Sequence, residues 1–223
     1  MKGKKCAALL TAAVLFTAAL TGCSGTPGDA SGSDVSDSGK PKLKVATNAE
    51  FDPWEYIENG EYVGADMDIM RAIADKLDME VEIQNMEFEA VLSALVSKTC
   101  DVAISGLTIN QTREKQVDFS DPYYKTAQVL IVRSDDNVFT GTNKEELDAQ
   151  LKNKKIGVCT GFTGQQYVEG DPNWPFEPIE GAEAVIYDNI ALAVQGLKNK
   201  AVDVIIMDGP TAEGAAATDE NKD

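Results

Sequence analysis

From Lys42 onward, apolar and polar positions follow patterns typical of strands and helices in turn. Lys42–Thr47 alternates the two kinds of side chain and is rich in strand-forming residues, which predicts a strand. Across 66–77, apolar residues recur at helical spacing, and acids stand near the N-terminal end, where the helix dipole favours them. The pattern continues with a short strand over 80–83, a helix over 88–97 and a buried strand over 101–105. This βαβαβ order predicts a parallel sheet with right-handed crossovers.

The same succession of elements repeats in the second half. Its expected elements are a strand over 127–132, a helix opened by the capping-box-like segment Thr142–Glu145, a strand over 155–158, a helix from 163, a strand over 184–187, a helix over 189–198 and a strand over 202–207. The halves also match in sequence, because Lys98–Gly106 (KTCDVAISG) and Lys200–Gly209 (KAVDVIIMDG) share the order lysine, aspartate, β-branched strand, polar residue and glycine. We therefore predict an α/β protein of two lobes, lobe one over 42–126 and lobe two over 127–223, each a mainly parallel sheet with flanking helices.

Residues that follow the strands are candidate binding residues, because ligands of open parallel sheets bind beyond the carboxyl ends of the strands. Two such sheets that face each other make a cleft between them. The candidates are Asn48, Phe51 and Trp54 after the first strand, Ser105, Gly106, Thr108 and Arg113 after the third, Thr160, Gly161, Phe162, Thr163 and Asp208 in lobe two, and Phe88 at the start of a helix.

Two of these candidates carry charge. Arg113 is one of only three arginines, and a guanidinium grips a carboxylate through two parallel hydrogen bonds. The alternative is a surface arginine paired with Glu114 or Asp118. Asp208 ends a wholly apolar strand, where an unpaired carboxylate would be costly, so it either binds a cation or caps the next helix.

The remaining candidates extend the same chemistry. Phe51 lies in a proline-containing loop, where exposed aromatic residues often meet ligands, although both Phe51 and Phe88 could be core residues. Gly161 and Thr163 offer backbone N–H groups at a helix start, which suits an anion. A carboxylate binder, an ammonium binder and two rings together match a free α-amino acid.

The N-terminal segment is typical of an export signal. Three lysines precede an uncharged run rich in alanine and leucine that ends in Leu20-Thr21-Gly22-Cys23, which resembles the lipobox of bacterial lipoproteins. We expect a signal peptide over 1–22, a lipid-modified (palmitate-bearing) Cys23 that anchors the protein to the membrane, and a flexible tether over 23–41 that lacks the apolar surface to fold. A plain signal peptide is the alternative.

Composition excludes several classes of function. The 223 residues contain 20 Lys+Arg and 37 Asp+Glu, a net charge of −17 that does not suit a nucleic-acid binder. The chain has no histidine, which excludes Ser/His or Cys/His catalysis and any zinc site that needs imidazole. Cys100 and Cys159 each stand in an apolar run, so we expect two separate buried thiols in preference to a disulfide.

These features resemble the extracytoplasmic solute-binding proteins of bacterial amino-acid ABC importers, the polar amino-acid type of family 3. The matching stretches are Val45–Tyr56, Gly64–Ile69, Asp101–Asn110, Arg113 with Val117–Tyr124, Gly157–Gly161 and Asp203–Asp208. The resemblance implies a type II periplasmic-binding-protein fold that closes by a hinge near 125–128. It also implies an extracytoplasmic, monomeric protein that delivers an L-amino acid to ABC permease subunits in the membrane, with no cofactor, no metal and no catalytic residue.

The resemblance further implies a role for each site residue. Arg113 would bind the ligand α-carboxylate, helped by the Thr108 hydroxyl and the Thr163 backbone N–H. Asp208 and the Gly106 carbonyl would bind the α-ammonium. The ligand-binding set expected in full is Asn48, Phe51, Phe88, Ser105, Gly106, Thr108, Arg113, Thr163 and Asp208, with Phe51 and Phe88 flanking the ligand side chain.

The sequence departs from the family pattern at two places. Asn48 stands where binders of basic amino acids often carry an acid, which weakens an assignment to lysine or arginine. Family members also return from lobe two to lobe one through a final strand crossing and helices, and no such segment follows 209–217. We therefore expect a C-terminally truncated chain with weak or absent binding and reduced stability.

Three other functions are consistent with parts of the pattern. The two-lobed fold also resembles periplasmic prephenate or arogenate dehydratases, which need a carboxylic acid over the leaving group, with Glu50 or Glu55 as candidates. A sensor module of a membrane receptor would need a membrane span and a signalling domain. A metal receptor could use Asp66 and Asp68, but their place at a helix start is better explained by capping.

Overall fold

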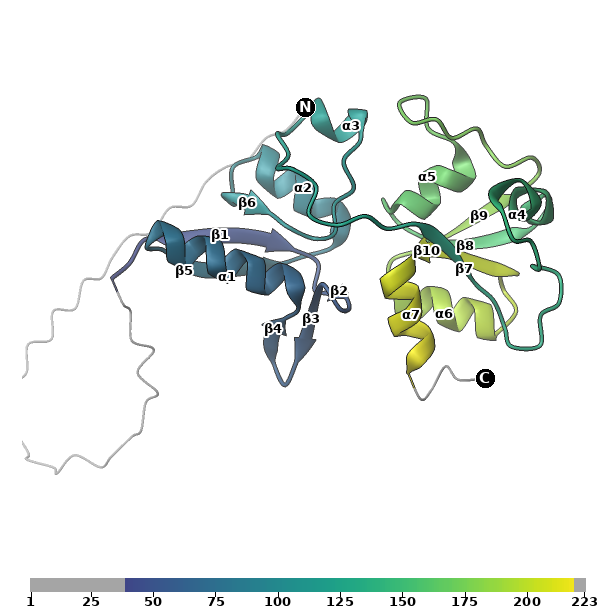
Figure 1. Ribbon diagram of the computed structural model, residues 1–223, viewed down its shortest axis with the longest axis horizontal. Coiled ribbons are helices and arrows are strands. Elements are labelled where there is room, and N and C mark those ends of the chain that lie inside the picture. Colours follow the sequence, from purple (N-terminus) through teal and green to yellow (C-terminus); the bar gives the residue numbers. More distant parts are fainter. Residues whose placement is uncertain (1–38, 219–223) are drawn as a thin grey trace, which may run out of the picture. The chain divides into compact units, whose positions relative to one another are not determined.

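The computed structural model describes residues 39–218, and lobe one is built on a three-stranded parallel sheet (Figure 1). The expected signal peptide, Cys23 and most of the expected tether lie outside the described residues. In the sheet, β1 (Lys42–Thr47) pairs on one side with β5 (Glu80–Asn85) and on the other with β6 (Val102–Ala103). No helix among residues 39–218 combines the length and the apolar character needed to cross a membrane.

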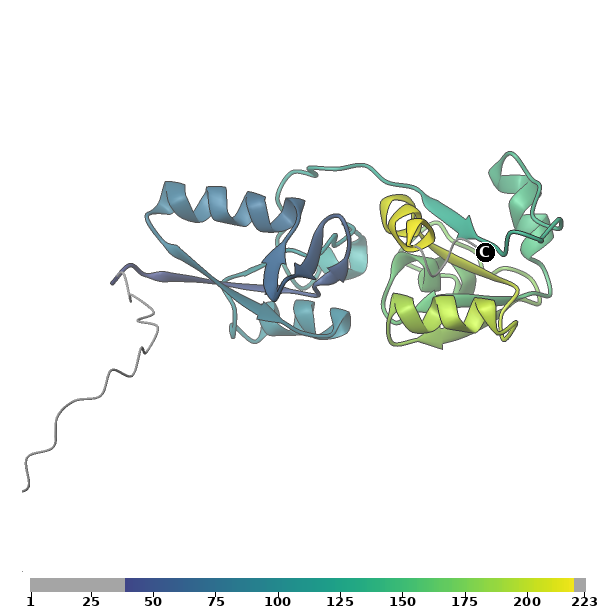
Figure 2. The same ribbon diagram turned by 90° about the horizontal axis from the view of Figure 1, so that it is seen from below.

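Two helices cover opposite faces of this sheet (Figure 2). Because successive side chains of a strand point to opposite faces, Val45 packs with the buried methionines of α1 (Ala65–Leu77), and Ala46 packs with Val91 and Ala94 of α2 (Phe88–Val96). Each helix buries its apolar face and leaves its polar face in water.

The strand expected over 101–105 is much shorter than predicted. Only Val102 and Ala103 pair with β1, and Ser105 and Gly106 already turn away from the sheet, with Gly106 at φ +54°. The polar end of this strand therefore belongs to the turn that faces the site.

An antiparallel meander that the periodicity does not predict follows β1. It consists of β2 (Glu50–Phe51), β3 (Glu55–Glu58) and β4 (Glu61–Val63). Asn59-Gly60 joins β3 to β4 with both residues at positive φ, which is the preference of a two-residue hairpin turn. Phe51 accordingly lies in a strand and is buried, so the expectation that it is an exposed loop residue is wrong.

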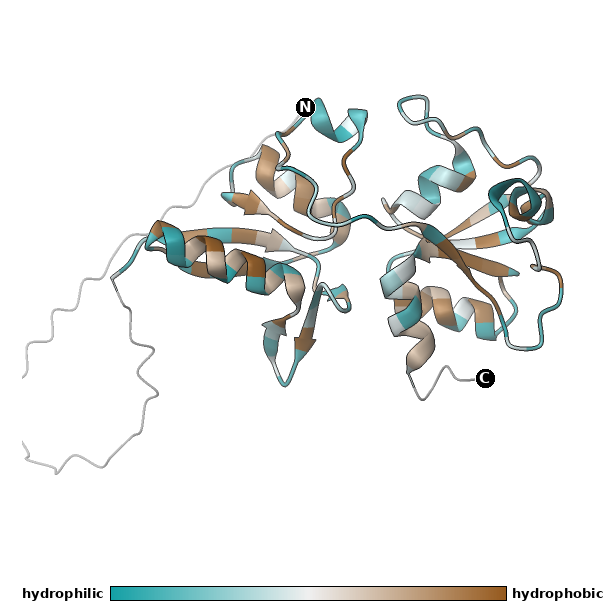
Figure 3. Ribbon diagram, viewed as in Figure 1, coloured by the Kyte–Doolittle hydropathy of each residue, from teal (hydrophilic) through white to brown (hydrophobic). Residues whose placement is uncertain are grey.

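Lobe two is built on a four-stranded sheet of order β7-β10-β8-β9. The strands are β7 (Gln128–Ile131), β8 (Lys155–Cys159), β9 (Glu183–Tyr187) and β10 (Val204–Asp208). β10 runs parallel to β8 and antiparallel to β7, so a single strand departs from the parallel arrangement. Apolar positions concentrate on the central strands and on the helix faces that cover them (Figure 3).

Four helices flank the sheet of lobe two. They are α4 (Lys144–Leu151), α5 (Thr163–Glu169), α6 (Ile190–Lys198) and α7 (Gly209–Ala217). Val204 and Ile206 of β10 pack in the cluster that contains Leu151 and Val168 of α4 and α5. Ile205 and Met207 point to the other face, into the cluster that contains residues of α6 and α7. β10 is therefore buried on both faces, as its continuous apolar run requires.

Asparagine side chains begin several helices. Asn143 caps α4 by accepting a hydrogen bond from the Glu146 backbone N–H, and the Glu146 carboxylate accepts one from the Thr142 N–H. The arrangement is similar to a capping box displaced by one residue from the expected Thr142–Glu145, but Glu146 bonds the residue before the cap and not the N–H of Asn143 itself. Elsewhere, Cys100 and Cys159 are both buried and unpaired, which confirms the prediction of two separate thiols.

Candidate functional site

Eight of the nine predicted ligand-binding residues line one small cavity. Its lining consists of Phe51, Phe88, Ser105, Gly106, Thr108, Arg113, Phe162, Thr163 and Asp208. These residues come from both lobes. Lobe one contributes residues from β2, the start of α2, the turn after β6 and the short helix α3 (Gln111–Glu114). Lobe two contributes residues from the turn after β8, the start of α5 and the end of β10. The cavity has a volume of about 10 Å³, which leaves room for no more than one water molecule.

Arg113 reaches this cavity from α3. Asn110 caps the helix by accepting a hydrogen bond from the Arg113 backbone N–H at 2.8 Å. The guanidinium is buried and donates Nη1–H to the Thr108 carbonyl at 2.8 Å and Nη2–H to the Gly161 carbonyl of lobe two at 3.1 Å. The Phe88 ring lies 5.5 Å from its Cζ, within cation–π range.

The electrostatic setting of Arg113 is that of a buried cation near one acid. Burial lowers its pKa, and the nearby Asp208 carboxylate partly offsets that effect. An arginine stays protonated in proteins, so the side chain places a fixed positive charge in the cavity. The alternative of a surface arginine paired with Glu114 or Asp118 is wrong, because Arg113 is buried and its hydrogen bonds go to carbonyl oxygens.

Asp208 supplies the negative charge. It ends β10 and is 9% exposed, and its Oδ1 accepts a hydrogen bond from Gln128 Nε2 at 2.9 Å. Burial raises the pKa of this carboxyl, while the Gln128 hydrogen bond and the Arg113 charge act in the opposite direction. Asp208 occupies the position before α7 but its side chain makes no capping hydrogen bond, so the structure does not support the alternative of a helix cap. Gln128, its partner, was not predicted as a site residue.

Three aromatic rings close the cavity. The Phe162 ring of lobe two lies edge-on to Phe51 at 5.8 Å and to Phe88 at 4.7 Å between centroids. Phe51 and Phe88 come from lobe one, at β2 and at the first residue of α2. Sequence reasoning placed Phe162 after a strand but did not assign it to the ligand-binding set, although its position next to Thr163 was a signal.

The small polar residues tie the two lobes together. The Thr163 hydroxyl donates a hydrogen bond to the Thr108 hydroxyl of lobe one at 3.2 Å. The Gly161 N–H donates to the Gln165 side chain at 2.8 Å and is therefore not available for an anion, contrary to the expectation for that residue. Thr163, the first residue of α5, keeps its place in the cavity lining.

Asn48 is the predicted residue that the structure does not bring into the site. Its side-chain N–H donates to the Met86 carbonyl at 3.0 Å, and its backbone N–H donates to the Ser105 hydroxyl at 3.0 Å. It lines neither this cavity nor the larger one beside it. Its position after β1 was predicted correctly, but its side chain is used to hold the turn before α2.

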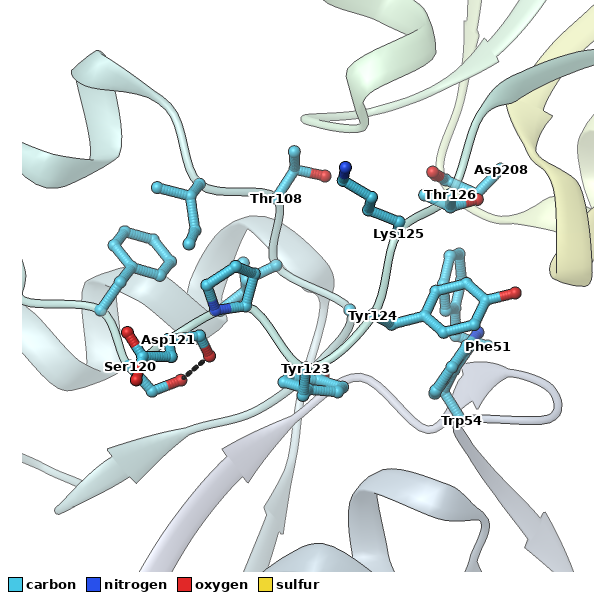
Figure 4. A pocket seen from close by; sticks show the side chains of 15 residues that line it. Phe51, Trp54, Thr108, Ser120, Asp121, Tyr123, Tyr124, Lys125, Thr126 and Asp208 are labelled. Carbon is cyan, nitrogen blue, oxygen red and sulfur yellow. Dashed lines mark hydrogen bonds between the residues drawn. The ribbon is translucent and has the colours of Figure 1, made fainter.

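A larger cavity of about 380 Å³ shares Phe51, Gly106, Thr108 and Asp208 with the small one (Figure 4). Most of its other lining residues come from one segment that precedes β7. That segment supplies Phe119, Ser120, Asp121, Pro122, Tyr123, Tyr124, Lys125 and Thr126. The Trp54 ring lies 4.4 Å from that of Tyr124 and forms an aromatic wall.

Two other sets of acids do not belong to the cavities. Glu50 and Glu55, the candidates for a dehydratase acid, line neither cavity. The expectation that Asp66 caps α1 is wrong, because its side chain makes no capping hydrogen bond. Its Oδ2 instead accepts hydrogen bonds from the Gly106 N–H at 3.2 Å and from the Tyr123 hydroxyl at 3.0 Å. Among residues 39–218, no three histidine, cysteine or acidic side chains are grouped closely enough to hold a metal ion.

The fold and this cleft define the class of solute-binding proteins. The chain belongs to the bacterial extracellular solute-binding proteins, family 3, whose sequence profile matches residues 43–175. Family members are extracytoplasmic transport-binding proteins, so the predicted family and its extracytoplasmic class are confirmed.

Individual relatives agree with this assignment. The chain is 34% identical over 206 residues to the arginine-binding extracellular protein ArtP of Bacillus subtilis, covering 92% of this chain and 74% of that one. It is 32% identical to the ABC transporter arginine-binding protein 1 of Escherichia coli, covering 75% of this chain and 63% of that one.

Solved structures match the fold. The arginine-bound form of truncated ArgBP from T. maritima is 34% identical with a TM-score of 0.70, covering 81% of this chain and 79% of that one. An ancestral arginine-binding protein bound to glutamine is 36% identical with a TM-score of 0.69, covering 79% of this chain and 73% of that one. The prediction of a two-lobed α/β fold is therefore confirmed.

Proposed function

We propose that this protein is the receptor of an amino-acid ABC importer, which captures a free L-amino acid between its lobes and delivers it to the permease. The observation that carries the proposal is the convergence of Arg113, Asp208 and three aromatic rings on one cavity between the lobes. A free α-amino acid carries a carboxylate, an ammonium and a side chain, so each part of the ligand meets a group of matching chemistry.

Arg113 would bind the ligand α-carboxylate. Two of its five N–H donors are used on the Thr108 and Gly161 carbonyls, which leaves donors for a ligand. Thr108 and Thr163, now bonded to each other, would turn their hydroxyl and backbone N–H groups to the same carboxylate. Asp208 and the Gly106 carbonyl would receive the α-ammonium.

The three rings that close the cavity must move apart when a ligand binds, because the volume of the cavity is too small for an amino acid. Phe51 and Phe88 from lobe one and Phe162 from lobe two would then flank the ligand side chain. Contacts to both lobes supply the differential free energy that closure around a ligand requires.

L-Arginine is the first ligand to test, followed by L-glutamine, L-histidine and L-lysine. The two curated relatives above are named for arginine, one solved relative is bound to glutamine, and another is described as an arginine-, lysine-, histidine-binding protein. Asn48 is a neutral residue that lines neither cavity, so any acid that selects a basic side chain must come from elsewhere, and Asp121 lines the larger cavity.

The remaining parts of the proposal concern partners and location. A lipid on Cys23 would hold the protein at the outer face of the cell membrane, and the chain would act as a monomer that docks on permease subunits. The extracytoplasmic family and the lipobox-like residues before Cys23 support this arrangement.

Isothermal titration calorimetry with the twenty L-amino acids tests the proposal on the purified protein. Arg113→Lys keeps the charge but loses the planar fork, and Asp208→Asn removes the charge that faces the ammonium. We expect each to weaken the best ligand at least tenfold, about 1.4 kcal/mol. Arg71→Lys is the matched control, because Arg71 is exposed and pairs with Asp68 away from the cavities. A folded protein that binds none of the twenty would overturn the proposal.

A further inference from the structure

Two acidic residues behind the site are fully buried without a cation. Glu55 of β3 and Asp66 of α1 each have 0% exposure. None of the ion pairs found among residues 39–218 involves either carboxyl. Burial of two ionised carboxylates without compensation is strongly unfavourable, so something must relieve the charge.

The backbone fixes these two residues beside each other. The Asp66 N–H donates to the Trp54 carbonyl at 2.9 Å, and the Ala65 N–H donates to the Pro53 carbonyl at 3.1 Å. The first turn of α1 is therefore bonded to the residues immediately before Glu55. A Cβ at Gly64 would collide with the Trp54 carbonyl, so only glycine permits this approach.

Each carboxyl uses one oxygen to hold the site turn. Glu55 Oε1 accepts a hydrogen bond from the Ser105 hydroxyl at 2.8 Å. Asp66 Oδ2 accepts hydrogen bonds from the Gly106 N–H and the Tyr123 hydroxyl, at 3.2 and 3.0 Å. Ser105 and Gly106 line the small cavity, and Tyr123 lines the larger one.

The other oxygen of each carboxyl has no donor. Glu55 Oε2 and Asp66 Oδ1 are both buried and accept no hydrogen bond from any described residue. The two carboxyl groups interact directly, and this contact, after burial, raises the pKa of Glu55 to about 10. Buried oxygens are almost always satisfied, and a protonated carboxyl is itself a donor.

We infer that Glu55 and Asp66 share one proton at neutral pH, and that the resulting carboxyl–carboxylate pair is a positioning unit for the Ser105–Gly106 turn and Tyr123. The proton on Glu55 Oε2 satisfies Asp66 Oδ1, and the pair carries one negative charge instead of two. Only that remaining charge faces the Gly106 N–H and the Tyr123 hydroxyl. The part of the inference that concerns binding of the ligand α-ammonium by the Gly106 carbonyl rests on the proposed function.

The shared proton makes stability depend on pH in a definite direction. Between the ordinary pKa of a glutamate and about 10, the folded protein holds a proton that the unfolded chain has released. Stability therefore falls as pH rises, and the equilibrium constant for unfolding grows up to tenfold per pH unit from this pair. The titratable groups that interact with Glu55 are Asp66 and Tyr123, and burial raises the pKa of Tyr123 further, so its hydroxyl stays protonated below pH 9.

Urea unfolding at pH 6, 7, 8 and 9 compares the wild type with Glu55→Gln and Glu58→Gln. The Glu55→Gln amide donates permanently to Asp66 and has no proton to lose. We expect the ratio of wild-type to Glu55→Gln unfolding constants to rise by up to tenfold per pH unit. Glu58→Gln, on the exposed part of the same strand, should parallel the wild type. Parallel profiles for the wild type and Glu55→Gln would overturn the inference.

A second measurement keeps the test independent of the variants. Glutamate carrying ¹³C at Cδ reports each carboxyl separately by NMR in the wild-type protein. We expect one glutamate resonance to keep the chemical shift of a protonated carboxyl at pH 8, and its absence would overturn the inference. The double variant E55Q/D66N places two amide donors face to face, so it should lose more stability than the two single variants together.

Affinity for L-arginine separates this inference from the proposed function. We expect Glu55→Gln to bind within about threefold of the wild type and Glu55→Ala to lose at least tenfold. Equal affinities of Glu55→Ala and the wild type would overturn the positioning role. If the wild type bound no amino acid, the proposed function would fail while the pH profiles and the NMR spectrum still decided the shared proton.

Discussion

Gly106 lies in the turn after β6 of lobe one, where the lining of the site begins. Its φ of +54° turns the chain away from β6, and a Cβ placed there would lie 2.9 Å from Phe51 Cε1. Glycine is favoured at this position for two reasons. The left-handed backbone conformation is costly for other residues, and the Phe51 ring fills the space that a side chain would occupy.

Gly106→Ala should therefore destabilise the protein by about 1–3 kcal/mol, from left-handed backbone strain and from the collision with Phe51. Gly60→Ala is the matched control, because Gly60 also has positive φ but no atom lies within 4 Å of its Cβ position. Chemical denaturation of both variants separates the two contributions. Equal losses of stability would show that the approach of Phe51 contributes nothing.

Sequence reasoning located most of the site at this scale because the rule it used concerns position along a strand. Among the residues that line the small cavity, Phe88 and Thr163 begin helices and Asp208 ends a strand, so their place needed no knowledge of side-chain direction. Ser105, Gly106 and Phe162 lie in the turns that follow β6 and β8. Asn48 satisfies the same positional rule, yet its side chain turns to the Met86 carbonyl. Which way a polar side chain turns depends on donors and acceptors brought near by the fold, and Met86 lies 38 residues away.

The short helix α3 decides how Arg113 is held. It spans four residues, too few for a helix to be stable alone, and its first turn is fixed by the hydrogen bond from the Arg113 N–H to Asn110. The position of the guanidinium relative to the cavity therefore depends on an asparagine that does not line it.

Asn110→Ala should lower stability by about 1 kcal/mol and also weaken ligand binding severalfold. Asn189→Ala removes the equivalent cap bond to the Leu192 N–H at the start of α6, which is remote from the cavities. It should cost similar stability and leave the affinity unchanged. Calorimetric affinity combined with thermal denaturation checks both, and equal affinities in the two variants would contradict the role given to α3.

Element prediction failed where periodicity carries too little information. Strands of two to four residues, such as those of the β2–β4 meander, are shorter than the window in which alternation can be recognised. The Asn59-Gly60 turn was the available signal, since this dipeptide is typical of two-residue hairpins. Both ends of each of the helices α1, α2 and α6 were predicted to within one residue, because each helix presents a wide apolar face.

At the scale of the whole molecule, contacts between residues of the two lobes determine whether the cleft is open or closed. Phe162 provides two ring pairs to lobe one, and Arg113 and Thr163 provide one hydrogen bond each across the cleft. A pair of edge-on rings contributes about 0.5–1.5 kcal/mol beyond its buried area. These contacts favour a closed form without a ligand, and a ligand must replace the ring contacts with its own.

Phe162→Ala should shift the ligand-free protein towards the open form, by about tenfold or more in the equilibrium constant. Small-angle X-ray scattering should then show a larger radius of gyration than for the wild type. Phe176→Ala is the control, because that ring stacks on Trp174 and lies edge-on to Tyr167, both within lobe two. An unchanged radius of gyration in Phe162→Ala would mean that the ring pairs do not hold the lobes together.

The order of strands in lobe two has a consequence for how the chain folds. β10 is the last strand along the chain, but it lies between β7 and β8 and joins them into one sheet. Lobe one contains all three strands of its parallel sheet by residue 103. Because a chain emerges from the membrane N-terminus first, β7 has no strand to pair with until the segment that contains β10 has followed it. During that interval the backbone N–H and C=O groups along the edge of β7 are open to pairing with another chain, which makes the incomplete lobe two prone to aggregation.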